Sequence, residues 1–147
     1  MNLIEQSLKI ALEAHAGQKD KAGWPYVLHP IRMMLKMDSE IGMAAALLHD
    51  VLEDSNLTAE TLREEGIPPE VVEAVLCLTR QENEPYEDFI ERAAKNPIAR
   101  KVKKADLEDN IDLLRLREIK DRDIERMKKY HIAWNRIKSV PAGKGEA

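Results

Sequence analysis

The sequence is poor in cysteine and in aromatic residues, and it has no long hydrophobic run. Because Cys77 is the only cysteine, an internal disulfide is excluded. No apolar segment approaches the roughly 18–20 residues of a membrane span, and the N-terminus lacks the layout of a signal peptide. A net charge of −4 gives no general attraction to nucleic acids or to anionic membranes. These absences predict a cytoplasmic protein without nucleic-acid or membrane partners.

The residues that are abundant are helix formers. Aromatic residues make up 4% of the chain and β-branched runs are almost missing, whereas Ala, Leu, Glu, Lys and Met dominate. We therefore expect an all-α fold, a compact bundle of about seven or eight helices. It should form one domain over residues 1–140, followed by a frayed tail over 141–147. The expected helices cover 3–14, a segment opened by Pro30, about 40–53, 58–66, 69–79, segments opened by Pro85 and Pro97, and about 121–139.

The stretch MAAALLHDVLEDS, residues 43–55, combines a core-like apolar run with four polar side chains. On one continuous helix, His49, Glu53, Asp50 and Asp54 would point at about 0°, 40°, 100° and 140°. The apolar side chains would occupy the opposite arc. This helix would offer one imidazole and three carboxylates along a single edge. The alternative interpretation is a solvated acidic face.

Two further positions extend this polar set. Asp106 shares its expected helix face with Val102 and Leu113, and a partly buried carboxylate needs a partner or a metal. A salt bridge to a lysine would also satisfy it. His29 precedes Pro30 at a helix start, where a cap or a packed core histidine is the alternative.

The combined set of two histidines and two carboxylates is His29, His49, Asp50 and Asp106. Such mixed nitrogen and oxygen ligands suit Mn²⁺, Fe²⁺ or Zn²⁺ and leave positions open for water and a phosphate oxygen. This pattern resembles the HD superfamily of metal-dependent phosphohydrolases. The segments 14–30 (AHAGQKDKAGWPYVLHP), 45–55 (AALLHDVLEDS) and 102–110 (VKKADLEDN) resemble the hydrolase domain of the RelA/SpoT family. In outline they are most similar to its stand-alone small alarmone hydrolases, over about residues 3–138.

The resemblance implies a helical HD fold that holds one Mn²⁺ and removes the 3′-pyrophosphate from guanosine tetra- or pentaphosphate. It implies hydrolysis alone, since no synthetase domain fits this length. The resemblance implies that the metal ligands are His29, His49, Asp50 and Asp106. It implies that Glu53 and Asp54 act on the attacking water, and that Asn110 and Lys21 contact the substrate.

One loop departs from the family pattern. Where the family usually has Arg-Lys-Ser-Gly, this chain has Asp20-Lys21-Ala22-Gly23. The arginine that would stack on guanine is thus an aspartate, which could instead accept hydrogen bonds from a base edge. Trp24 offers another stacking face, unless it is structural.

Other functions remain compatible with the sequence. Another HD phosphohydrolase, such as a nucleotidase or an NADPH phosphatase, is one alternative. A catalytically idle helical module that binds nucleotide or protein is the second, although the presence of Glu53 and Asp54 beside the ligand set argues against it. The base preference, the physiological metal and the oligomeric state stay open.

Overall fold

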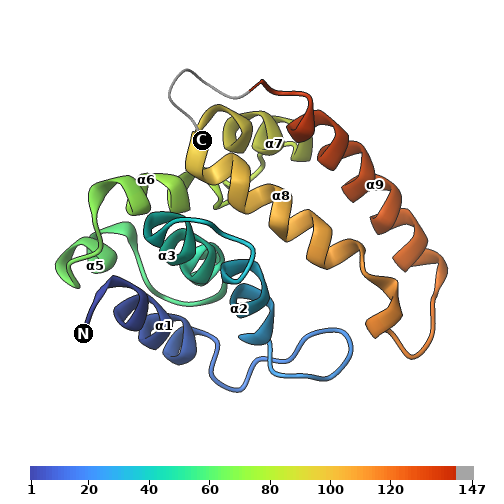
Figure 1. The fold of residues 1–147 in the computed structure, drawn as a ribbon. Helices are drawn as coiled ribbons and strands as arrows, with labels where there is room; N and C mark the ends of the chain where they lie inside the picture. Colours follow the sequence, from blue (N-terminus) through green and yellow to red (C-terminus); the bar gives the residue numbers. More distant parts are fainter. Residues whose placement is uncertain (142–147) are drawn as a thin grey trace.

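The helix-forming composition gives an all-helical chain in a computed structural model that describes residues 1–141 (Figure 1). Within this range, β pairing is limited to one isolated bridge between Lys19 and Pro25. The helices are α1 (Leu3–Ala14), α2 (Leu28–Met34), α3 (Glu40–Leu48), α4 (Val51–Asp54), α5 (Ala59–Glu64), α6 (Pro69–Cys77), α7 (Tyr86–Lys95), α8 (Pro97–Ile111), the 3₁₀ helix η1 (Leu113–Arg115) and α9 (Asp121–Lys138). The predicted all-α class is confirmed.

Most helix starts follow the local signals in the sequence. The Thr58 side chain accepts a hydrogen bond from the backbone of Thr61 at the start of α5. Asn96 caps α8 in the same way, with Pro97 in the first turn, and Pro69 opens α6. Pro85 instead lies at the N-cap of α7, one position earlier than expected.

Helix α3 forms the centre of the larger hydrophobic core. Its residues Ala44, Ala45, Ala46, Leu47 and Leu48 are fully buried. The small alanine side chains allow close approach of the neighbouring helices, and α3 packs against α1, α2, α6 and α8 (Figure 1). The packing of α3 therefore fixes the position of His49 and Asp50, which follow Leu48.

Helix α8 lies between two packed groups. It contacts α2 and α3 on one side and α7 and α9 on the other (Figure 1). A second cluster joins α7, α8 and α9 through Ile90, Ala94, Leu107, Ala133 and Ile137. Polar side chains on the α2–α3 side of α8, Asp106 among them, are consequently drawn into the interior.

The expected continuous helix over 40–53 is wrong. Helix α3 ends at Leu48, and the short α4 begins at Val51, with His49 and Asp50 between them. The imidazole Nδ1 of His49 lies 2.8 Å from the Ala46 carbonyl, an acceptor that a continuing helix would use for backbone hydrogen bonding. This interruption divides the expected helix into α3 and α4 and reorients the acids beyond it.

Two other expectations concern the start of α2 and the C-terminal tail. Helix α2 begins at Leu28, before Pro30, which lies inside its first turn. The expected frayed tail falls, beyond Pro141, outside the described residues, and the domain limits 1–140 remain a prediction. No helix in the part of the chain described is long and apolar enough to cross a membrane.

Candidate metal centre

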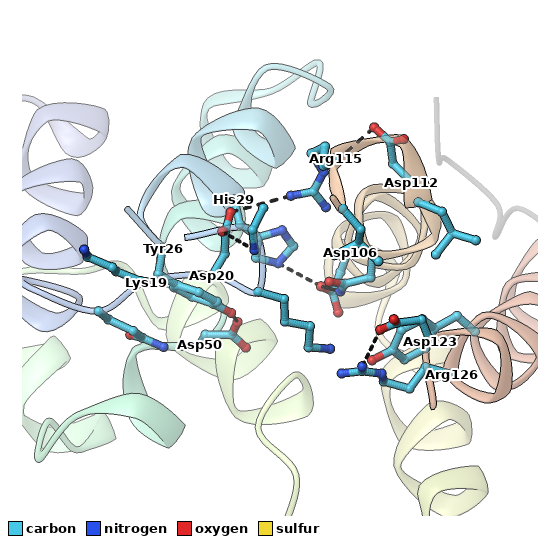
Figure 2. A pocket seen from close by; sticks show the side chains of 17 residues that line it. Lys19, Asp20, Tyr26, His29, Asp50, Asp106, Asp112, Arg115, Asp123 and Arg126 are labelled. Carbon is cyan, nitrogen blue, oxygen red and sulfur yellow. Dashed lines mark hydrogen bonds and ion pairs between the residues drawn. The ribbon is translucent and has the colours of Figure 1, made fainter. Parts of the chain in front are cut away.

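Three separate segments bring two histidines and two aspartates together. His29 comes from α2, His49 and Asp50 from the α3–α4 junction, and Asp106 from α8. One ligand atom from each of His29, His49 and Asp50 lies within 4.8 Å of the others. Asp106 Oδ1 lies 3.0 Å from His29 Nε2 and 3.8 Å from His49 Nε2. Figure 2 shows His29, Asp50 and Asp106 lining one pocket.

Both imidazole rings are oriented by an acceptor behind them. His49 Nδ1 lies 2.8 Å from the Ala46 carbonyl, and His29 Nδ1 lies 2.6 Å from Asp109 Oδ2. These partners assign the proton to Nδ1 in each ring, so each Nε2 can present its lone pair toward the two aspartates. Carbonyl or carboxylate support of this kind is typical of histidines that bind metals.

An unsatisfied nitrogen supports a metal at this place. His49 Nε2 is buried and makes no hydrogen bond within residues 1–141, although it lies 3.0 Å from Asp50 Oδ2. A buried nitrogen without a hydrogen-bond partner, facing two carboxylates, is satisfied by a coordinated cation. The donor set therefore fits a divalent metal.

The electrostatics of the metal-free site favour a cation as well. Burial raises the pKa of Asp50, but the neighbouring charge of His49 outweighs it and brings the pKa to about 2. Burial likewise disfavours the charged form of Asp106, yet Lys103 and the two histidines hold its pKa well below the usual range. Both carboxylates are thus anionic at neutral pH.

The same environment acts on His29. Burial lowers its pKa, whereas hydrogen bonds with Asp106 and Asp109 raise it further, to about 9. Without a metal, the ring therefore carries a second proton, on Nε2, at neutral pH, and its two N–H groups donate to Asp106 and Asp109. A bound cation would take the place of the Nε2 proton.

The lysine salt bridge considered for Asp106 is present too. Lys103 Nζ lies 2.7 Å from Asp106 Oδ2, and the Asn110 amide donates to Oδ1 at 2.8 Å. Since Lys103 occupies Oδ2, Oδ1 is the oxygen that faces the histidines. Asn110, expected to contact substrate, lines the pocket while it holds this carboxylate.

The two acids expected to serve the attacking water make different contacts. Glu53 Oε1 accepts a hydrogen bond from the Arg80 backbone at 2.6 Å, and burial raises the pKa of Glu53. Asp54 Oδ2 accepts from the Gln18 amide at 3.1 Å, and Gln18 in turn lies 2.8 Å from His15 Nδ1. The interrupted helix thus directs Glu53 toward α6 and α7 and Asp54 toward the loop after α1.

Asp20 organises the loop in which it lies. Its Oδ1 accepts hydrogen bonds from the backbone of Ala22 at 2.9 Å and of Trp24 at 3.0 Å. Such a local turn is common for aspartate, and Gly23, at φ +88°, supplies a backbone conformation that other residues adopt rarely. Trp24 is 64% exposed and is not among the side chains that line the pocket.

The pocket beside the ligand set has a volume of about 370 Å³. Its basic side chains include Lys21, Arg115 and Arg126. Figure 2 shows Arg115 and Arg126 on the side of the pocket that faces His29 and Asp106. Burial and the nearby Arg126 lower the pKa of Lys21. Arg115 Nη1 lies 3.7 Å from Asp20 Oδ2, so an arginine from η1 reaches the loop position where the family has its own.

Some residues of the site were not anticipated from the sequence. Asp109 supports His29 and also accepts hydrogen bonds from Arg32 Nε and Nη2 at 2.8 and 2.9 Å. Its position, three residues after Asp106 on the same helix face, was an available signal. Arg115 carried no such signal, because it enters the pocket through the tertiary packing of η1. Tyr26, whose hydroxyl donates to Asp50, lay inside a matching segment without an assigned role.

Comparison with known proteins agrees with this geometry. No family model matches the chain. It is 35% identical to the guanosine-3′,5′-bis(diphosphate) 3′-pyrophosphohydrolase of Aquifex aeolicus over 124 residues, 76% of this chain and 18% of that protein. It is 34% identical to the bifunctional (p)ppGpp synthase/hydrolase SpoT of Escherichia coli over 98 residues, 63% of this chain and 14% of that protein. The chain thus spans less than a fifth of the length of these curated relatives.

A solved structure extends the likeness to the whole fold. The structure of a metazoan ortholog of SpoT that hydrolyzes ppGpp superposes with a TM-score of 0.78 at 25% identity. The match covers 97% of this chain and 89% of that one. The chain is therefore an HD-type relative of the RelA/SpoT hydrolases.

Proposed function

We propose that the protein is a divalent-metal-dependent phosphohydrolase that removes the 3′-pyrophosphate from guanosine tetra- or pentaphosphate or from a closely related nucleotide. The observation that carries this proposal is the orientation of His29 and His49. Each has Nδ1 committed to an acceptor and Nε2 turned toward two anionic aspartates, of which Asp106 is buried and Asp50 is half-buried. This set lies in a pocket that also contains basic side chains, and the named activities of the relatives supply the substrate class.

His29, His49, Asp50 and Asp106 would hold the metal. Their mixed imidazole nitrogens and carboxylate oxygens suit Mn²⁺, Fe²⁺ or Zn²⁺, and we propose Mn²⁺ because the resemblance to the RelA/SpoT hydrolases implies it. When bound, such an ion supplies positive charge to the phosphate and acidifies a water molecule. Lys103 and Asn110 would keep Asp106 in position, since each bonds one of its oxygens. Asn110 would also contact the substrate, as it lines the pocket.

Glu53 is the proposed proton acceptor. Its pKa is raised by burial, so its carboxylate is a stronger base than an exposed one. In the reaction, a water oxygen bonds to the phosphorus attached to ribose O3′, and the bond between that phosphorus and O3′ breaks. The proton lost by water goes to Glu53, which returns it to solvent and is again a carboxylate. The O3′ oxygen takes up one proton from solvent, and both phosphoryl groups leave as pyrophosphate.

The remaining side chains suit an anionic nucleotide. The volume of about 370 Å³ falls in the range of small-molecule sites. Lys21 and Arg126 would meet phosphate groups there, whereas Asp20 would face the base. Asp54, whose Oδ2 accepts a hydrogen bond from Gln18, would act on the attacking water from the side of the loop that follows α1.

A nucleotide panel tests the proposal. The purified protein with Mn²⁺ is incubated with guanosine and adenosine 3′-pyrophosphates, NADPH and nucleoside monophosphates, and pyrophosphate and phosphate are measured separately. We expect pyrophosphate from the 3′-pyrophosphates and none with an Asp106→Asn variant. Release of phosphate alone, from NADPH or from monophosphates, would favour the other HD phosphohydrolases.

A further inference from the structure

A second, smaller cavity of about 180 Å³ adjoins the ligand set. It shares Asp50, Asp106, Asn110 and Tyr130 with the larger pocket. The two cavities therefore meet along the carboxylates of the candidate metal centre. The side chains that line only the smaller cavity come from α4, the α6–α7 connection, α7, α8 and α9. They are Glu53, Leu78, Arg80, Tyr86, Phe89, Lys103 and Lys129.

Three cations line this small cavity, and two of them are not neutralised. Lys103 is committed to Asp106 at 2.7 Å. Arg80 Nε donates to a backbone carbonyl, that of Glu84, at 3.0 Å. Among the ion pairs within residues 1–141, none includes Arg80 or Lys129. Asp50 and Asp106 also line this cavity, but a metal held by them would offset their charges. Glu53 then supplies the remaining opposing charge, and its Oε1 accepts from the Arg80 backbone rather than from the guanidinium.

The two unpaired cations converge on one aromatic ring. Lys129 Nζ lies 3.9 Å from the centre of the Tyr86 ring, and Arg80 Cζ lies 5.6 Å from it. Their side chains come from different elements, so the convergence is built by the tertiary fold. Burial together with the positive charges of Arg80 and Lys103 lowers the pKa of Lys129. An anion placed among these groups would relieve that repulsion.

We propose that Arg80 and Lys129 bind the terminal phosphoryl group of the 3′-pyrophosphate in this small cavity. The identity of the ligand rests on the proposed function. The phosphoryl group that is attacked must lie at the metal ligands, and the nucleoside and the terminal phosphoryl group extend from it in different directions. The 370 Å³ pocket has room for the nucleoside, and the 180 Å³ cavity has the size and the charge for a phosphoryl group. The chain would thereby select a 3′-pyrophosphate over a 3′-monophosphate.

The binding of inorganic pyrophosphate tests this assignment independently of turnover. Pyrophosphate and inorganic phosphate are titrated calorimetrically into the Mn²⁺-loaded wild type, Lys129→Gln and Lys128→Gln. Lys128 is a matched control, because it is the neighbouring lysine of α9, pairs with Glu125 at the surface and lines neither cavity. We expect Lys129→Gln to weaken pyrophosphate binding by about 10-fold or more, the usual effect of losing a charge-assisted contact. Inorganic phosphate has a single phosphoryl group, which would bind at the metal ligands first, so its affinity should change by less than about 3-fold.

Two further measurements make the result decisive. Lys129→Arg should restore most of the pyrophosphate affinity, because it restores the charge. The metal content is measured after each titration, to check that pyrophosphate has not removed the ion. Equal pyrophosphate affinities for Lys129→Gln and Lys128→Gln, or no pyrophosphate binding by the wild type, would overturn the cavity assignment. If pyrophosphate binding depends on Lys129 but no nucleotide 3′-pyrophosphate is hydrolysed, the cavity assignment stands and the proposed function fails.

Discussion

His29 and Asp109 are in close contact behind the candidate metal centre, with Nδ1 2.6 Å from Oδ2. The carboxylate orients the ring, so that Nε2 faces Asp106 on the other side. Asp109 is itself fixed by Arg32, through Nε and Nη2. His29, the proposed ligand, is thus held by a chain of groups from α2 and α8 in the absence of a metal.

Asp109→Asn should weaken metal binding by about 10–100-fold, the usual cost of losing an outer-layer carboxylate. Asparagine keeps an acceptor oxygen near Nδ1 but loses the negative charge that makes the ring a better donor to the metal. Affinity is measured by competition with a fluorescent chelator. Glu108→Gln, which changes an exposed carboxylate on the same helix, serves as the control. Unchanged affinity in Asp109→Asn would mean that the contact does not support a metal ligand.

Replacing a proposed ligand should remove the metal itself. His49→Ala and Asp106→Asn each delete or weaken one donor. Asp109, the other buried carboxylate of α8, cannot replace Asp106 because it is held by His29 Nδ1 and by Arg32. Asparagine is used at position 106 because it can still accept from the buried Lys103. Elemental analysis of protein purified without chelator is the measurement. Stoichiometric metal in both variants would exclude the assignment.

The stability of the metal-free protein should fall at alkaline pH. The pKa of His29 is about 9 in the folded protein, against about 6.5 for an unperturbed histidine. A raised pKa means that the folded state binds the proton more tightly, so this contribution is complete below pH 6.5 and is lost as the pH rises through 9. Its size is roughly 3 kcal/mol.

Urea unfolding of chelator-treated protein between pH 6 and pH 9.5 measures this loss. His29→Gln cannot take up the proton, so its stability should depend less on pH over the same interval. Metal-loaded wild type should also lose less, because the ring then serves the ion. Identical pH profiles for wild type and His29→Gln would contradict the role given to the proton.

The separate environments of Glu53 and Asp54 predict unequal roles. Glu53 lies beside the ligand carboxylates in the small cavity, with a pKa raised by burial, whereas Asp54 is bound to Gln18 at the loop. Glu53→Gln should therefore lower kcat by about 10²-fold or more at unchanged metal content, as expected when a proton acceptor is lost. Asp54→Asn should have the smaller effect, since its amide oxygen can still accept from Gln18. A larger loss in Asp54→Asn would reverse the assignment.

Helix-forming composition and capping signals were sufficient to predict the class and most helix starts. Asn96 and Thr58 act within one turn of their own position, so their effect is readable locally. The contact between His49 and Ala46 is local too, but whether a histidine bonds its own helix or continues it depends on the packing around α3. The break at His49 and Asp50, between α3 and α4, was for this reason not predicted.

Some residues of the candidate site could likewise be predicted from the sequence, and others could not. His29, His49, Asp50 and Asp106 could be grouped by residue type and by resemblance, and the structure brings them together. Side chains that enter from other elements could not be grouped. Arg115 and Lys129, for example, reach the two cavities through the placement of η1 and α9.

Asp20 has two roles in the structure that bear on base preference. Its Oδ1 closes the loop through the backbone of Ala22 and Trp24, and its Oδ2 lies 3.7 Å from Arg115. Asp20→Asn keeps an oxygen that can close the turn but removes the charge beside Arg115. Asp20→Arg removes both and supplies a cation where the family usually has one. Comparison of the two variants therefore separates the contribution of Asp20 to loop structure from its contribution to base preference.

Asp20→Arg should shift the preference of the enzyme toward guanine by about 1–2 kcal/mol, the value of a cation–π contact that is partly desolvated. Asp20→Asn should leave the ratio of guanine to adenine unchanged and lower KM for both substrates, because a negative charge no longer faces an anionic nucleotide. The measurement is kcat/KM for guanosine and adenosine 3′-pyrophosphates with wild type and both variants, alongside thermal unfolding to detect damage to the loop. If Asp20→Arg folds normally and keeps the wild-type ratio, position 20 does not face the base. Discrimination between bases would then have to come from other side chains of the pocket, of which Arg115 is the nearest cation to Asp20.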